Sequence, residues 1–128
     1  MKKFFLLIIM PILLASCETD YYDYFIITNR CDENIEVDVT FSNERNNNMS
    51  FPISANSEFL FFSENWDSER SRYTNSIFKS IAIRKGDSTS PINYADDIYW
   101  EKVKVQNSWG CRISFEVYFY LYINPEDF

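Results

Sequence analysis

The stretch from Arg112 to Ile123 alternates strictly between two kinds of side chain. One set is apolar and comprises Ile113, Phe115, Val117, Phe119, Leu121 and Ile123, while the other comprises Arg112, Ser114, Glu116, Tyr118, Tyr120 and Tyr122. Successive side chains of a β-strand point to opposite faces of the sheet, so this period of two predicts one long strand with a buried apolar face.

Shorter runs of β-branched, aromatic or alternating residues predict the remaining strands. They cover residues 24–28, 35–42, 49–53, 58–62, 77–85, 92–94 and the second half of 97–106. Polar turns at 29–34, 43–48, 54–57, 85–88 and 107–110 separate them, and residues 63–76 around Trp66 predict a loop with at most one helical turn. Seven or eight strands without intervening helices predict an all-β fold, an antiparallel β-sandwich, with a small open barrel as the alternative.

The N-terminus has the layout of a secretory signal peptide: Lys2 and Lys3, an apolar run over 4–14, and the small residues Ala15 and Ser16 before Cys17. A helix of eleven residues spans about 17 Å against about 30 Å of hydrocarbon, so a permanent transmembrane helix is not expected. The chain therefore divides into a signal peptide (1–16), a polar tether (17–23) and a single β-domain (24–128).

The residues Leu14-Ala15-Ser16-Cys17 resemble the lipobox of bacterial lipoproteins. The resemblance implies that Cys17 becomes the lipidated first residue of the mature protein, whose two or three acyl chains would hold it firmly in a membrane. The acidic residues of 18–23 resemble a surface-export tag of Bacteroides-type lipoproteins, and Glu18 in place of Asp indicates the outer membrane. The alternative is a plain secreted protein.

Residues 120–128, at the end of the sequence, carry a second resemblance to lipoproteins. Together with the lipobox and one β-domain, they resemble the small uncharacterised lipoproteins of Bacteroidetes, several of which end in a strand followed by an acidic, aromatic tail. The resemblance implies a sandwich fold and carries over no activity or functional residue.

Two further cysteines, Cys31 and Cys111, would enter an oxidising compartment, where an even pair indicates a disulfide. Closing so long a loop would stabilise the fold by about 4–5 kcal/mol in the chain-entropy description. The alternative is two buried thiols. We expect no metal site and no cofactor, since the chain contains no histidine.

Charge and residue types exclude several functions. Without residues 1–16, ten basic and nineteen acidic residues would remain, a net charge of −9, which argues against nucleic acid as a partner. The absence of histidine excludes Ser-His and Cys-His nucleophiles, and two glycines cannot form a phosphate-binding loop. We interpret the acidic residues Glu64, Asp67, Asp96 and Asp97 as solvating side chains and not as a catalytic pair, so we expect no enzyme.

Tyr118, Tyr120 and Tyr122 share the second face of the long strand, about 7 Å apart. They form either an aromatic platform for a glycan or protein, or a face covered by residues 63–76 or by the tether; we favour the covered face. The sequence thus predicts a non-enzymatic lipoprotein of the outer membrane or cell surface, a structural or accessory module, or alternatively a glycan- or protein-binding module using these tyrosines.

Overall fold

The computed structural model describes residues 18–66 and 74–128. Eight strands form two four-stranded sheets packed face to face, which confirms the all-β sandwich. The elements are β1 (Thr19–Asn29), β2 (Ile35–Phe41), β3 (Met49–Ile53), β4 (Glu58–Trp66), α2 (Thr74–Ile77), β5 (Phe78–Lys85), β6 (Ser88–Thr89), the 3₁₀ turn η1 (Asp97–Tyr99), β7 (Trp100–Trp109), β8 (Arg112–Ile123) and the 3₁₀ turn η2 (Pro125–Asp127).

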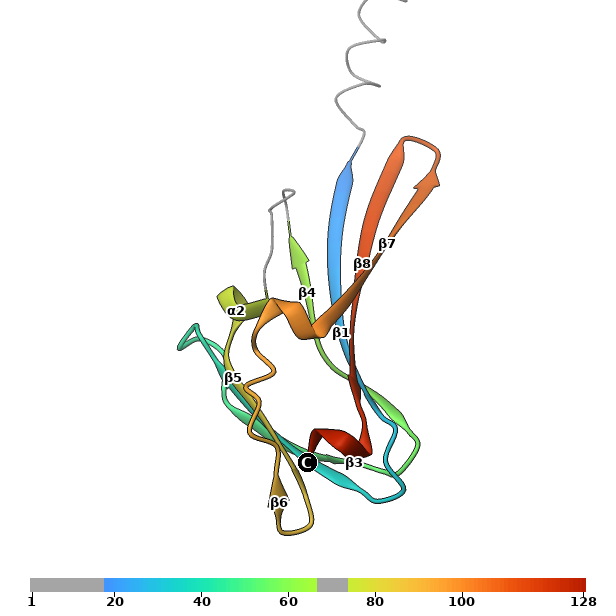
Figure 1. Ribbon diagram of the computed structural model, residues 1–128. Helices are drawn as coiled ribbons and strands as arrows, with labels where there is room; N and C mark the ends of the chain where they lie inside the picture. Colours follow the sequence, from blue (N-terminus) through green and yellow to red (C-terminus); the bar gives the residue numbers. More distant parts are fainter. Residues whose placement is uncertain (1–17, 67–73) are drawn as a thin grey trace, which may run out of the picture.

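Sheet A has the strand order β4-β1-β8-β7, and its two central strands run parallel. Every residue from Thr19 to Asn29 pairs with one from Ile113 to Ile123, while β4 and β7 pair antiparallel on the outside. The long strands β1, β8 and β7 rise beyond the second sheet in Figure 1, with the start of β1 beside the β7–β8 turn. Sheet A therefore extends past the sandwich at the end where the described chain begins.

Sheet B has the order β3-β2-β5-β6 and pairs antiparallel throughout. Its β5–β6 hairpin and the β7–β8 hairpin of sheet A each have a two-residue loop that starts with glycine. Gly86 and Gly110 have φ angles of 59° and 63°, the left-handed conformation that the first loop position of a type II′ turn requires. The predicted turn at 85–88 is confirmed, whereas the second hairpin turns later than predicted, after Trp109.

Aromatic side chains fill the centre of the core. Phe25 of β1 is fully buried and stacks on Phe119 of β8 with 4.5 Å between ring centroids. Phe78 of β5 meets Phe25 edge-on at 5.0 Å, and Trp100 lies against the same ring at 5.9 Å. These contacts join the two sheets, because Phe25, Phe119 and Trp100 belong to sheet A and Phe78 to sheet B.

The boundaries of several elements differ from the prediction. β1 begins at Thr19 and not at Tyr24, so most of the predicted tether is a paired strand in which Asp23 is buried. Residues 92–94 are not a strand, and β6 was not predicted. On β8 the inward face is as predicted, but burial is complete only at Phe119, Leu121 and Ile123. Sheet B does not reach the rest of the strand, so Val117 is only half-buried.

The predicted disulfide between Cys31 and Cys111 is wrong. Cys31 is buried, with its Sγ 4.0 Å from the carbonyl oxygen of Ile123 at the end of β8. Cys111 lies in the exposed turn before Arg112, at the start of β8. The strand between them is about 36 Å long at about 3.3 Å per residue, whereas a disulfide needs Cα atoms within about 7 Å.

Candidate binding surface

The outer face of sheet A, opposite the core, carries five tyrosines in one continuous row. Tyr118, Tyr120 and Tyr122 come from β8, and the parallel register places Tyr24 of β1 directly beside Tyr118, with Tyr22 next along β1. We name this row (Tyr22, Tyr24, Tyr118, Tyr120, Tyr122) the tyrosine stripe. The three residues predicted from β8 are thus brought together with two that the prediction missed.

The rings of the tyrosine stripe stack on one another. Ring centroids are 6.4 Å apart for Tyr22 and Tyr24, 5.1 Å for Tyr24 and Tyr118, 6.4 Å for Tyr118 and Tyr120 and 6.2 Å for Tyr120 and Tyr122. A ligand ring inserted between two of them would need about 7–8 Å, twice the optimal carbon–carbon separation. Neighbouring rings of the stripe therefore leave no room for a ligand ring between them.

Tyr118 and Tyr122 of the stripe have raised pKa values. The hydroxyl of Tyr118 donates a hydrogen bond of 2.7 Å to Oε2 of Glu116, which raises the pKa of Tyr118 to about 12. Desolvation, and to a smaller extent Glu101, raises the pKa of Tyr122, although the guanidinium of Arg30 lies 4.1 Å from its ring centroid. At physiological pH the hydroxyl groups of Tyr118 and Tyr122 are therefore uncharged, beside the carboxylates of Glu116 and Glu101.

Apolar side chains and a groove border the tyrosine stripe. Val103 and Val105 of the edge strand β7 and Leu60 of β4 are exposed on either side of it. A groove of about 490 Å³ lies at the Tyr22 end, lined by Asp20, Tyr22, Tyr24, Asn107, Trp109, Arg112, Ser114 and Glu116. Its volume falls within the range of about 300–1,000 Å³ that small-molecule sites occupy.

The link between Glu116 and Tyr118 can be tested by titration. Glu116→Gln should return the pKa of Tyr118 from about 12 toward the ordinary 10.0, because the charged acceptor is lost. The raised pKa stabilises the fold below about pH 10, and this contribution is lost as the pH rises through the folded value. Absorbance of tyrosinate should show Tyr118, and to a smaller extent Tyr24, whose pKa is raised by desolvation and also by Glu116, ionising earlier in this variant. Glu44→Gln in the β2–β3 loop should leave the curve unchanged.

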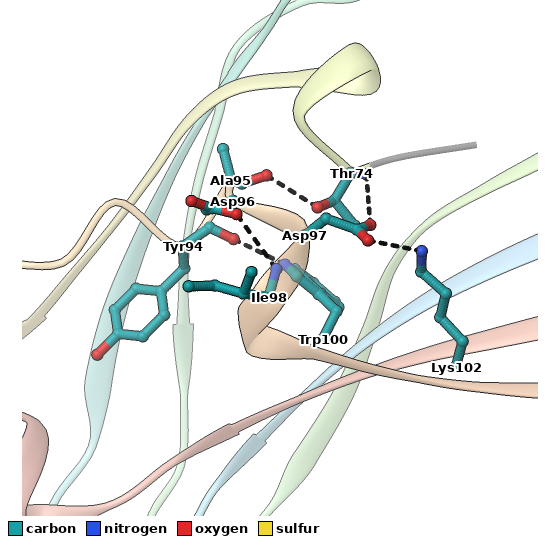
Figure 2. A network of polar contacts seen from close by, with 8 residues as sticks. All are labelled: Thr74, Tyr94, Ala95, Asp96, Asp97, Ile98, Trp100 and Lys102. Carbon is teal, nitrogen blue, oxygen red and sulfur yellow. Dashed lines mark hydrogen bonds and ion pairs between the residues drawn. The ribbon is translucent and has the colours of Figure 1, made fainter. Parts of the chain in front are cut away.

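The candidate carboxylates Asp96 and Asp97 have structural partners around η1 (Figure 2). Asp96 caps the turn by accepting from the backbone N–H of Ile98 at 3.2 Å. Asp97 accepts from the N–H of Thr74 at 3.1 Å and forms an ion pair of 2.7 Å with Lys102. These bonds connect α2 to the start of β7, so the two carboxylates have hydrogen-bond and ion-pair partners in the fold and are not simply solvated.

The segment before β7 also anchors Trp100, whose Nε1 donates to the carbonyl of Tyr94 at 2.7 Å (Figure 2). The hydroxyl of Thr74 donates to the carbonyl of Ala95 at 2.8 Å (Figure 2).

The other two candidate carboxylates are Glu64 and Asp67. Glu64 belongs to β4, where it is the register partner of Asp23 in β1. Asp67 lies outside the described residues. Within residues 18–66 and 74–128, no three His, Cys, Asp or Glu side chains group as metal ligands.

The signal segment 1–16 and Cys17 also lie outside the described residues, so lipidation stays a prediction. The described part of the chain has no helix of the length and hydropathy needed to cross a membrane. Comparisons with protein-family models, curated proteins and solved structures found no match to this chain.

Proposed function

We propose that this protein is a non-enzymatic binding module, anchored by lipid at Cys17 in the outer membrane and facing the periplasm or the cell exterior, that holds a glycan on the tyrosine stripe. The observation that carries the proposal is the stripe itself: five half-buried tyrosines in a row on the face of sheet A that points away from the core. The lipobox-like residues supply the argument for the anchor.

The chemistry of the stripe favours a glycan. A phenol hydroxyl both donates and accepts hydrogen bonds, whereas the neighbouring carboxylates of Glu101 and Glu116 only accept. A ligand that pairs with both kinds of group must donate hydrogen bonds as well as accept them, as the hydroxyl groups of a glycan do, and on an acidic protein it should not be anionic. The tyrosine rings and the exposed Val103 and Val105 would contact the apolar C–H groups of a sugar.

A protein ligand that adds a strand to the edge of sheet A fits the structure less well than a glycan does. Sheet A ends in β4 on one side and in β7 on the other, and Lys102 and Lys104 lie on β7. Lysine on an edge strand is a common protection against pairing with another chain, because its charge would have to be buried. We therefore place the ligand on the face of sheet A and not on its edge.

A glycan array on the mature chain carrying Cys17→Ser tests this function. Calorimetry with a ligand so identified should show that Tyr120→Phe weakens binding about tenfold, about 1.4 kcal/mol, because the hydroxyl of Tyr120 has no hydrogen-bond partner in the described structure and is open to a ligand. Tyr99→Phe, a change away from the stripe, should leave affinity unchanged. An array without any binding, or equal losses in the two variants, would contradict the proposal.

A further inference from the structure

The β7–β8 turn lies beside the point where the described chain begins. We name Trp109, Gly110, Cys111 and Arg112 the hairpin tip. The backbone N–H of Ile113, next to the tip, donates to the carbonyl of Glu18 at 3.1 Å, and Arg112 forms an ion pair of 2.8 Å with the carboxylate of Glu18. Figure 1 shows the start of β1 and this turn at the same end of the molecule.

Trp109 is the most exposed large apolar side chain of the described residues, with 89% of its surface open to solvent. It pairs with Arg112 across the hairpin and is thus two strands away from Glu18. Adjacent strands are about 4.8 Å apart, which places the Trp109 backbone about 10 Å from that of Glu18. Cys17 immediately precedes Glu18 in the sequence.

We propose that Trp109 lies in the phospholipid headgroup region of the membrane that holds Cys17. This inference rests on the lipid anchor of the proposed function and adds a second contact to it. The interfacial zone of one leaflet is about 5–8 Å thick, so an anchor at Cys17 brings the hairpin tip to it. Tryptophan suits this zone because its ring is apolar while its N–H can hydrogen-bond to headgroups or water.

The charges at this end of sheet A fit a zwitterionic lipid surface. Arg112 compensates Glu18, and its Nε lies 3.8 Å from a carboxylate oxygen of Asp20. The pairing reduces the repulsion that unpaired carboxylates would meet at phosphate groups, while the acidic chain as a whole disfavours strongly anionic lipid. β8 then leads away from the membrane, so that Tyr122 and the C-terminus are at the distant end, accessible to a ligand.

Fluorescence of the lipidated protein in phosphatidylcholine–phosphatidylethanolamine vesicles tests the contact. The emission of Trp109 is the difference between the wild-type protein and Trp109→Phe. We expect this emission to be blue-shifted, protected from aqueous acrylamide and largely lost when the lipids carry bromine near the headgroup. The remaining emission, from Trp66 and Trp100, should not respond to brominated lipid.

Two outcomes would overturn the inference. In the first, acrylamide quenches the emission of Trp109 as readily as in the unanchored Cys17→Ser chain. In the second, the emission is protected from both quenchers, which would indicate a protein partner at the hairpin tip. The mass of the same sample separates the two proposals. An acylated Cys17 with Trp109 in water contradicts only the membrane contact, whereas a mature protein without acyl chains contradicts the anchor and the contact together.

Discussion

Cys17→Ser should release the protein from membranes completely. The anchor that we propose is lipid on this side chain, and serine cannot form the thioether that carries it. The apolar run 4–14 is too short to replace it as a membrane span. After a carbonate wash of membranes from expressing cells, the wild-type protein should stay in the pellet and the variant should be in the supernatant.

Cys111→Ser is the matched control for that experiment. It makes the same chemical change in the exposed turn of the β7–β8 hairpin, and the variant should stay in the pellet like the wild-type protein. A Cys17→Ser variant that pelleted with the membranes would contradict the lipid anchor.

Phe25→Ala should destabilise the fold by about 3–5 kcal/mol, the range found when a buried phenylalanine is truncated. Phe25 contacts rings from both sheets, so its loss leaves a cavity that neither sheet can close by itself. Small domains have a free energy of unfolding of about 5–15 kcal/mol, and this loss is a large part of it. Urea unfolding followed by circular dichroism measures the difference.

Phe59→Ala makes the same substitution on a side chain that is 45% exposed in β4. It should cost much less than the change at Phe25, because less apolar surface returns to water and no enclosed cavity forms. Equal losses for the two variants would show that the core does not lie where the structure places it.

The long strand could be predicted from the sequence because its alternation continues for twelve residues, and β8 has the predicted bounds. The same period exists in β1, where Tyr22 and Tyr24 alternate with Asp23 and Phe25. The acidic residues concealed it, since a run containing Asp20 and Asp23 is also typical of a solvated tether. Sequence reasoning therefore missed two members of the tyrosine stripe, although the signal was present.

Other features depend on how strands pair, which local patterns do not contain. The parallel pairing of β1 with β8 aligns Tyr24 with Tyr118, and it also separates Cys31 from Cys111 by the length of β8. The half-burial of Val117 likewise follows from the shorter second sheet and not from its neighbours in sequence. The tether does not cover the tyrosines as predicted, because residues 19–23 lie in the sheet as part of β1. Residues 67–73, in the middle of the other predicted cover, lie outside the described residues.

Chemical-shift mapping tests most directly whether the tyrosine stripe is the ligand-binding face. Amide spectra of the isotopically labelled mature chain carrying Cys17→Ser would be recorded with and without the glycan found on the array. The largest shifts should fall on Tyr118, Tyr120 and Tyr122 and on the adjoining residues of β1 and β7. Shifts confined to β2, β3 and β5 of sheet B, with the tyrosine stripe unchanged, would contradict it.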